Sequence, residues 1–386
     1  MKAKLCLATS GEFGQYRNLK TEVSKALVNG MKQVDPRPLI ICRDFKRAKE
    51  QNIRKAIPFG RKLIYLIQGT LKALTGSMNG AISDYLIDRF TSFKINRCDL
   101  LYAIPPSYLT TIRKVKANGG LAVIHAGTSH PLYSSEVGMK EGIKATRIST
   151  WARDRRLKTI QEADYIFALS DFVRETYLQQ GVSSDKIYVT PLGVDEKRFK
   201  PGDKKDTVFR VIGVANYSSK KGYQYLLEAW KNLKLENAEL VLVGNPDQYM
   251  ERLVKEYQHI CPNIRSVRHT DPLQYYQSAS VFVHPSLTEG SAKVTYEAMA
   301  CGLPVLCTHE SGSIIEDSKE GYIIQSRDVE SIQERLLELY NTPERADEMG
   351  RKGRMKILEG YTWDHYAERV ATYLREILDK RNKGDI

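Results

Sequence analysis

The stretch EGSAKVTYEAMACGLPVLCT, residues 289–308, decides the fold of this 386-residue chain. It follows SVFVHPS (280–286), an apolar run rich in Val and Phe that ends in a proline-containing turn, and it closes in the apolar run LPVLCT (303–308). This order predicts a strand, a turn, a helix from about Ser291 and a second strand. Small residues from Ala298 onward let the helix pack closely on its sheet, so we expect a buried parallel sheet.

The same run predicts a ligand site at the start of the helix. Backbone N–H groups near Gly290, Ser291 and Ala292 would be the unpaired donors of the first turn, and with the helix dipole they favour an anion such as a diphosphate. Glu289 is expected in the turn and Glu297 about two helical turns along, on roughly the same side of the helix axis. The pair can therefore accept hydrogen bonds from hydroxyls at two ends of one ligand. A nucleotide sugar has that layout. The alternative is that both glutamates are solvated helix residues.

Short apolar runs alternate with helical stretches along the whole chain. The predicted strands lie at 1–9, 36–44, 98–105, 121–127, 163–169 and 186–192 in the first half, and at 207–215, 238–244, 264–270, 280–286, 303–308 and 321–326 in the second. Such alternation predicts an α/β protein, and the charged segment 195–207, with its Pro and Gly, separates two doubly wound, Rossmann-like domains. Ligands bind beyond the carboxyl ends of parallel strands, so the two facing domains should form a cleft.

The run at 289–308 resembles the donor site of the large family of retaining glycosyltransferases with an E-x(7)-E motif, which includes many bacterial group 1 enzymes of lipopolysaccharide, capsule and exopolysaccharide synthesis. The resemblance extends over residues 163–386 and is loose before them. The other stretches that carry it are ADYIFALSDFVRETYLQQGV (163–182), KIYVTPLGVDEKRF (186–199), KKGYQYLLEAWKNL (220–233), AELVLVGNP (238–246), YYQSASVFVHPS (275–286), EGYIIQSRD (320–328) and YTWDHYAERV (361–370).

This resemblance implies the GT-B fold, in which the last helix crosses back onto the first domain. We therefore expect an acceptor-binding domain at 1–195, a linker at 196–206, a donor-binding domain at 207–361 and the crossover helix at 362–386.

The resemblance also implies transfer of a hexosyl unit from a nucleotide diphosphate sugar to an acceptor hydroxyl, with retention at the anomeric carbon. Glu289 would orient the donor sugar and Glu297 the ribose. Lys221 and the helix start, including Lys293, would stabilise the departing diphosphate. The front-side displacement of this family requires no cofactor, and nothing in the chain resembles the Asp-x-Asp metal site of other transferases, so we expect no metal.

The loop VIGVANYSSKKG (211–222) is expected to hold the diphosphate, because the family carries an Arg and a Lys there. The Lys is present as Lys221, but Asn216 stands at the position of the Arg and Ala215 at that of the preceding Gly. Either Lys220 supplies the missing charge or Asn216 contributes a neutral hydrogen bond, and the sequence leaves both open.

Three further segments are candidates for ligand contacts. His125 lies near the end of the predicted strand at 121–127, where the family often has a His that touches the donor sugar, and His130 follows in a loop that could face donor or acceptor. A lone histidine is more often structural. The turn TSGEFGQYRN is not a G-x-G-x-x-G motif, so Gly14 is expected to let the backbone approach a sugar or phosphate. His269 lies where contacts to the donor base are expected.

Composition favours a cytoplasmic enzyme. Six cysteines lack C-x-x-C or His spacing and lie mostly inside apolar runs, which is typical of reduced, packed thiols. The N-terminus lacks the apolar run of a signal peptide, and no segment reaches ~18 consecutive apolar residues.

The net charge of +13 is concentrated in the first half of the chain. Residues 42–62 are densely basic and lead into a segment whose leucines and isoleucine at 63, 66, 67, 71 and 74 share one helical face. One interpretation is that residues 42–75 rest on an anionic membrane surface on the cytoplasmic side. The other is a core helix preceded by a solvated basic helix. Nucleic acid is not an expected partner, because no recognised binding motif is present.

Two alternative functions stay open. A nucleotide-sugar 2-epimerase would share the architecture, and it differs in changing stereochemistry at carbon 2 without transferring the sugar. A catalytically silent nucleotide-sugar-binding protein is the other alternative, which the replaced Arg favours. The sequence does not identify the donor base, the donor sugar, the acceptor or the oligomeric state.

Overall fold

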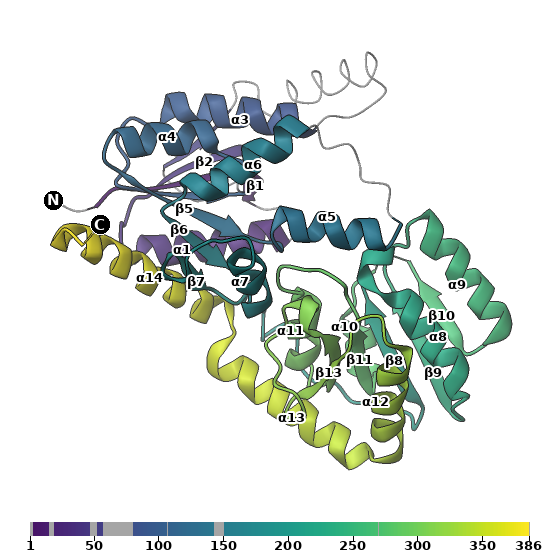
Figure 1. Cartoon of the computed structure of the whole chain (residues 1–386). Coiled ribbons are helices and arrows are strands. Elements are labelled where there is room, and N and C mark those ends of the chain that lie inside the picture. Colours follow the sequence, from purple (N-terminus) through teal and green to yellow (C-terminus); the bar gives the residue numbers. More distant parts are fainter. Residues whose placement is uncertain are drawn as a thin grey trace.

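The chain forms two domains, each built on one parallel sheet covered by helices (Figure 1). The structure is a computed structural model, and it describes residues 3–14, 19–46, 52–56, 80–105, 107–142, 150–268 and 270–385.

The first domain contains a seven-stranded parallel sheet in the order β3-β2-β1-β4-β5-β6-β7. Its strands are β1 (Leu5–Gly14), β2 (Leu39–Lys46), β3 (Ile53–Lys55), β4 (Leu100–Ile104), β5 (Leu121–Ala126), β6 (Tyr165–Ala168) and β7 (Ile187–Val189). Its helices are α1 (Leu19–Lys32), α3 (Gly80–Lys94), α4 (Leu109–Ala117), α5 (Pro131–Lys140), α6 (Thr150–Glu162) and α7 (Asp171–Leu178), with a short 3-10 turn, η1 (Ser184–Lys186).

Alternate residues of these strands enter two separate cores, as the period of two in a strand requires. In β1, Leu5 and Leu7 pack with α1 and with the last helix of the chain, whereas Cys6 and Ala8 pack with α3 and α4 on the other face. The sheet is therefore covered on both faces, which explains why its strands are apolar almost throughout.

The second domain contains a six-stranded parallel sheet in the order β10-β9-β8-β11-β12-β13. Its strands are β8 (Phe209–Val214), β9 (Ala238–Val243), β10 (Ile264–Val267), β11 (Val281–His284), β12 (Val305–Thr308) and β13 (Gly321–Ile324). Its helices are α8 (Tyr223–Leu233), α9 (Gln248–Ile260), α10 (Leu273–Ser278), α11 (Lys293–Ala300), α12 (Val329–Asn341) and α13 (Pro343–Gly360), with the 3-10 turns η2 (Ser219–Lys221) and η3 (His309–Ser311).

All twelve predicted strands are present in the structure. The additional strand is β3, which lies inside the basic stretch 42–62. The expectation of a basic helix there is wrong for the described part, because residues 42–46 complete β2 and residues 53–55 pair with it as an edge strand. The apolar helical face predicted over residues 63–74 lies outside the described residues.

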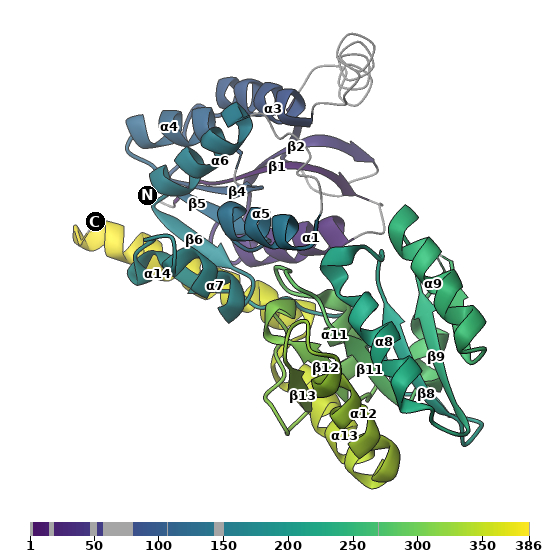
Figure 2. The same ribbon diagram turned by 45° about the vertical axis from the view of Figure 1, so that its right-hand side comes forward.

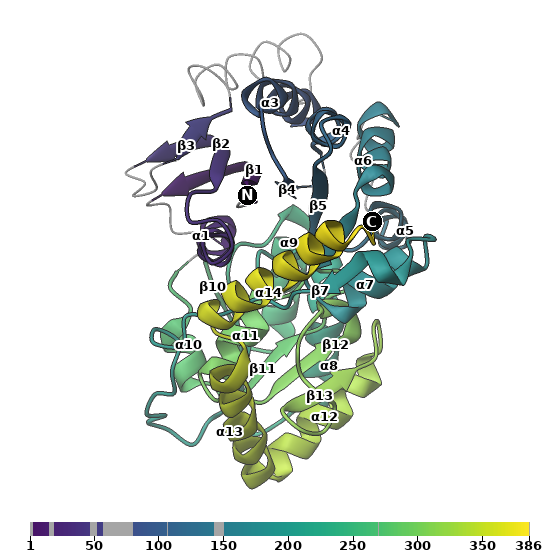
Figure 3. The same cartoon turned by 90° about the vertical axis from the view of Figure 1, so that its left-hand side faces the viewer.

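The last helix, α14 (Trp363–Lys383), crosses back from the second domain and lies beside α1 (Figure 3). The two helices approach closely because Gly30 has no side chain: a Cβ atom there would lie 2.4 Å from the carbonyl oxygen of Ala367. Val370 and Leu374 of α14 are fully buried in the same core as α1. The crossover helix expected from the resemblance is therefore observed.

Candidate active site

The candidate site lies where the strand order of the second sheet reverses. After β8 the chain builds β9 and β10 on one side, and then returns to place β11 on the other side of β8. In such sheets ligands bind beyond the carboxyl ends of the strands at this switch point. Here the loops 215–222 and 285–292 leave those ends.

Glu289 is held by two basic side chains from these strand ends. Its Oε1 is paired with the ammonium of Lys221 and lies 3.2 Å from Nε2 of His284. His284 is buried, and burial lowers its pKa despite the neighbouring carboxylate, so the ring is neutral near pH 7. A neutral ring that donates from Nε2 must accept at Nδ1, and the Tyr223 hydroxyl lies 3.1 Å from that atom.

The charge of Glu289 is stabilised by this arrangement. Burial alone would raise its pKa, but the hydrogen bond from His284 and the charge of Lys221 outweigh burial and bring the pKa down to about 2. Glu289 is therefore a fixed anion at every pH at which the protein is handled.

Helix α11 begins at Lys293, two residues later than predicted. The expectation of an unpaired N–H at Ala292 is wrong, because that group donates to the carbonyl of Ser311 at 2.9 Å. The N–H groups of Gly290, Ser291, Lys293 and Val294 have no hydrogen-bond partner among the described residues, and Ala292 supplies no side-chain cap. Four backbone donors thus remain beside Glu289, where an anion can bind.

Glu297 lies deeper and is held by different partners. Its Oε1 lies 3.1 Å from the ammonium of Lys293, and its Oε2 accepts a hydrogen bond of 3.1 Å from the hydroxyl of Tyr276. Burial raises the pKa of Glu297 in spite of both contacts. Lys293 also reaches the carboxylate of Glu22 on α1, at 2.7 Å.

The two candidates for the missing arginine point in different directions. Lys220 extends toward α5 of the first domain, where its ammonium donates to the carbonyl of Ser134 at 3.3 Å. Burial lowers its pKa. Asn216 is exposed at the end of β8. Neither side chain contacts Glu289, whereas Lys221 does.

The two histidines of the first domain are both buried, and burial lowers the pKa of each to about 4. Nδ1 of His125 lies 2.9 Å from the hydroxyl of Tyr102. His130 is the N-cap of α5 and accepts from the N–H of Leu132, and its ring packs edge-on against Tyr177. His130 thus has a structural task in this helix, and its predicted acceptor contact stays a prediction.

Gly14 ends β1, and its backbone pairs with Lys46 of β2. His269 lies outside the described residues, and its predicted contact with the donor base stays a prediction.

The first domain contacts the loop 285–292 directly, which the sequence did not reveal. Ser129 donates its N–H to the carbonyl of Glu289 at 3.2 Å, and its hydroxyl lies 2.8 Å from that of Thr288. Ser170 donates to the carbonyl of Gly290 at 2.6 Å. Gly290 is required here, because a Cβ atom would lie 2.0 Å from the carbonyl oxygen of Gly127.

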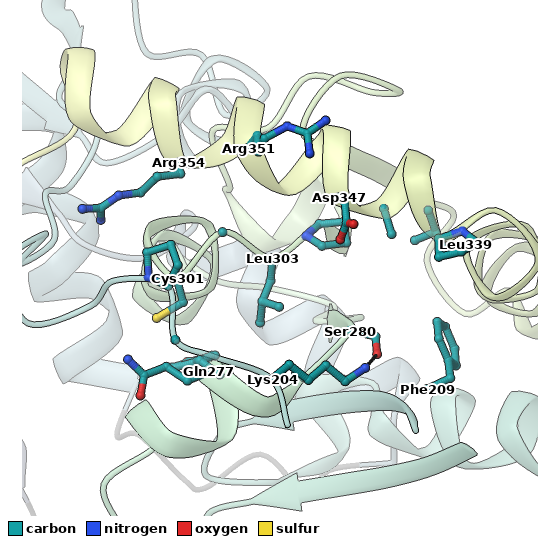
Figure 4. Close-up of a pocket in the computed structure, with 18 of the residues that line it drawn as sticks. Lys204, Phe209, Gln277, Ser280, Cys301, Leu303, Leu339, Asp347, Arg351 and Arg354 are labelled. Carbon is teal, nitrogen blue, oxygen red and sulfur yellow. Dashed lines mark hydrogen bonds between the residues drawn. The ribbon is translucent and has the colours of Figure 1, made fainter. Parts of the chain in front are cut away.

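A cavity of about 750 Å³ lies elsewhere, at the amino ends of the second sheet between the linker, α10 and α13 (Figure 4). Lys204, Gln277, Leu303 and Arg351 line it. The candidate site lies at the carboxyl ends, so this cavity is a separate feature.

Within the described ranges, no group of three or more His, Cys, Asp or Glu side chains is placed to hold a metal ion. In the same part of the chain, no helix combines the length and apolarity needed to cross a bilayer.

The architecture is that of the GT-B fold. The chain aligns with the crystal structure of Anabaena Alr3699/HepE in complex with UDP and glucose at a TM-score of 0.67, with 16% identity, over 97% of this chain and 100% of that one. At this identity the likeness shows the fold alone.

Residues 194–356 match the family described as "Glycosyl transferases group 1", and this part of the chain belongs to that family. The chain is similar to the capsular polysaccharide biosynthesis glycosyltransferase CapM of Staphylococcus aureus, with 27% identity over 43% of this chain and 47% of that protein. It is also similar to the alpha-maltose-1-phosphate synthase of Mycolicibacterium smegmatis, with 24% identity over 67% of this chain and 76% of that protein. The chain thus spans about half the length of the first relative.

Proposed function

We propose that this protein transfers a hexosyl unit from a nucleotide diphosphate sugar to an acceptor hydroxyl, with retention at the anomeric carbon. The observation that carries the proposal is the position of Glu289. This carboxylate is fixed by Lys221 and His284 directly beside the N–H groups of Gly290 and Ser291, which have no hydrogen-bond partner in the described part of the chain. A half-buried acceptor next to an anion-binding site suits a sugar hydroxyl bonded beside a diphosphate.

In this proposal the bond between the anomeric carbon and the diphosphate oxygen breaks as the acceptor oxygen bonds to the same face of that carbon. The acceptor proton passes to the departing phosphate oxygen. Lys221 and the N–H groups at the start of α11 stabilise the charge that grows on the diphosphate. Glu289 accepts from a hydroxyl of the sugar and Glu297 from the ribose. No metal or other cofactor takes part.

His125 is proposed to face the donor sugar as a neutral ring. With its pKa lowered to about 4 by burial, it can donate or accept a hydrogen bond, and it carries no charge at neutral pH. The space beside this ring is open because residue 127 is a glycine. A Cβ atom at that position would lie 3.4 Å from Nε2 of His125 and would partly cover the ring.

The pathway we propose is the synthesis of a cell-surface polysaccharide or lipopolysaccharide. CapM is named for capsular polysaccharide biosynthesis, and Alr3699/HepE was solved with UDP and glucose. The excess positive charge of the first half further supports a peripheral position on the cytoplasmic membrane face. Co-sedimentation with vesicles should then require anionic lipid and weaken as salt rises, and equal binding to zwitterionic vesicles would contradict it.

The function is tested with a panel of nucleotide sugars, first by thermal shift and then by product analysis. A donor at 100 times its dissociation constant should add ~2.7 kcal/mol of stability. Labelled sugar should appear in a glycan with the anomeric configuration of the donor. Label that stays in the nucleotide sugar with inverted carbon 2 would indicate an epimerase, and binding without transfer or hydrolysis would indicate a silent binding protein.

A further inference from the structure

Lys293 lies between two carboxylates that come from different domains. It is the first residue of α11, where the diphosphate is proposed to bind. Its ammonium is 2.7 Å from Oε2 of Glu22 on α1 and 3.1 Å from Oε1 of Glu297. Helix α1, like α5, lies on the side of the first domain that is turned to the second (Figure 2).

This cluster is largely shielded from water. The side chains of Lys293, Glu297 and Glu22 are 19%, 7% and 32% exposed. Interactions between charges in such a place are screened much less than on an open surface. The ammonium of Lys293 is therefore shared between two carboxylates, and a change in its contact with one carboxylate affects its contact with the other.

The ammonium is closer to Glu22 than to Glu297. A carboxylate offers about four acceptor positions, and Glu297 uses one for Lys293 and one for the Tyr276 hydroxyl. Glu297 therefore retains acceptor capacity for further donors. If Glu22 lost its charge, Lys293 would have Glu297 as its remaining carboxylate partner in this cluster and would close on it.

We propose that Glu22 is a positioning residue of the donor site. From the first domain it draws the ammonium of Lys293 away from Glu297, and so keeps Glu297 open to the ribose hydroxyls of the nucleotide. The inference rests on the proposed function, because it takes the ligand of Glu297 to be a ribose.

Two other side-chain contacts between the domains provide controls. Glu141 pairs with Arg327 at 2.8 Å, and Glu175 with His309 at 2.7 Å. In both pairs, as in Glu22 with Lys293, the acid belongs to the first domain. Glu175 does not touch Glu289 or Glu297, so a variant of it reports on domain contact alone.

The experiment measures the binding of UDP and GDP, each compared with its 2′,3′-dideoxy form, by titration calorimetry. Wild-type protein should prefer the ribose form about tenfold or more, since a hydrogen bond to a charged group contributes ~1.5–3 kcal/mol. In Glu22→Gln the preference should fall below about threefold, with the dideoxy affinity unchanged. Glu175→Gln should keep the wild-type preference. Glu22→Asp retains the charge on a shorter side chain, so its ribose preference should lie between those of the wild type and Glu22→Gln. This variant replaces Glu22→Gln in the test if Glu22→Gln does not fold.

Equal weakening of both nucleotide forms in Glu22→Gln would assign Glu22 to domain contact and overturn the inference, as would an unchanged ribose preference. In either case the proposed function survives. A wild-type protein that binds neither nucleotide, or that binds both forms alike, would instead remove the ribose role of Glu297, and this inference with it.

Discussion

Of the two glutamates of the candidate site, Glu297 is buried and Glu289 is half-buried, and their surroundings act on their pKa values in opposite directions. At Glu289 the hydrogen bond from His284 and the charge of Lys221 outweigh burial, and the pKa falls to about 2. At Glu297 burial prevails over the charge of Lys293, and the pKa lies above its ordinary value of 4.5. Glu289 is therefore a fixed charge, whereas the charge of Glu297 depends on its neighbours.

This difference suits two different tasks. A group that orients the reacting sugar must keep one protonation state and one position through the reaction. Glu289 has two side-chain partners within its own domain, Lys221 and His284. A group that recognises the nucleotide contributes to binding and can respond to domain contact. Glu297 shares its lysine with Glu22 of the first domain. We therefore expect their variants to affect different kinetic constants.

The largest effect is expected from Glu289→Ala. If this carboxylate holds a sugar hydroxyl in the transition state, turnover should fall by ~10²-fold or more. Steady-state kinetics with the donor identified by the panel measures this, and thermal unfolding shows whether the variant is folded. Glu256→Ala, at an exposed position of α9, is the matched control. Wild-type turnover in a folded Glu289→Ala protein would remove the central assignment.

The next comparison is between the adjacent lysines of the loop 215–222. Lys221→Ala should lower turnover by about 10²-fold, because a preorganised cation is lost where charge develops. Lys220→Ala should cost less than about tenfold, because this ammonium is bonded to α5 at Ser134. Single-turnover measurements separate chemistry from release. Equal, small losses in both variants would mean that this loop does not bind phosphate.

Much of this architecture could be predicted from the sequence because it rests on local signals. Apolar runs of four to eight residues marked every strand of the second sheet, and the order of strand, turn and helix placed Glu289 in the turn before α11 and Glu297 on that helix. Edge strand β3 was missed, since three residues with two basic side chains carry little apolar signal.

The partners of the site residues could not be predicted, because they come from distant parts of the chain. Glu22 meets Lys293 across 271 positions, and Ser170 meets Gly290 across 120. No periodicity links such pairs, and they arise from the way the two domains pack. The role of His284 could have been predicted from the sequence, because this residue ends the strand before Glu289. A polar residue at the carboxyl end of an apolar strand, at the point where the strand order reverses, indicates a ligand site.

A smaller effect is expected from Glu297→Gln. The amide keeps the shape and loses the charge, so the dissociation constant for the nucleotide should rise about tenfold while turnover at saturation changes little. Tyr276→Phe, which removes the hydrogen bond to Oε2, should change the affinity less. Titration calorimetry gives the affinities and steady-state kinetics the turnover. A loss confined to turnover would reverse the roles assigned to the two glutamates.

The smallest effect, and the one that separates the two carboxylates most directly, is a pH dependence. The raised pKa of Glu297 means that it takes up a proton first as the pH falls, and a protonated Glu297 accepts ribose hydroxyls less well, whereas Glu289 stays ionised down to about pH 2. Nucleotide affinity should therefore weaken by a few-fold as the pH falls toward 5, before turnover at saturation is affected.

The two groups also affect folding stability with opposite signs. The lowered pKa of Glu289 contributes stability that is present above pH 4.5 and lost toward pH 2, while the raised pKa of Glu297 favours the folded state as this carboxyl group protonates. Affinity measured from pH 7.5 to 5 in wild type and Glu297→Gln tests the weakening of nucleotide affinity, since the variant should lose the pH dependence of binding; the same dependence in both proteins would assign the titration to another group.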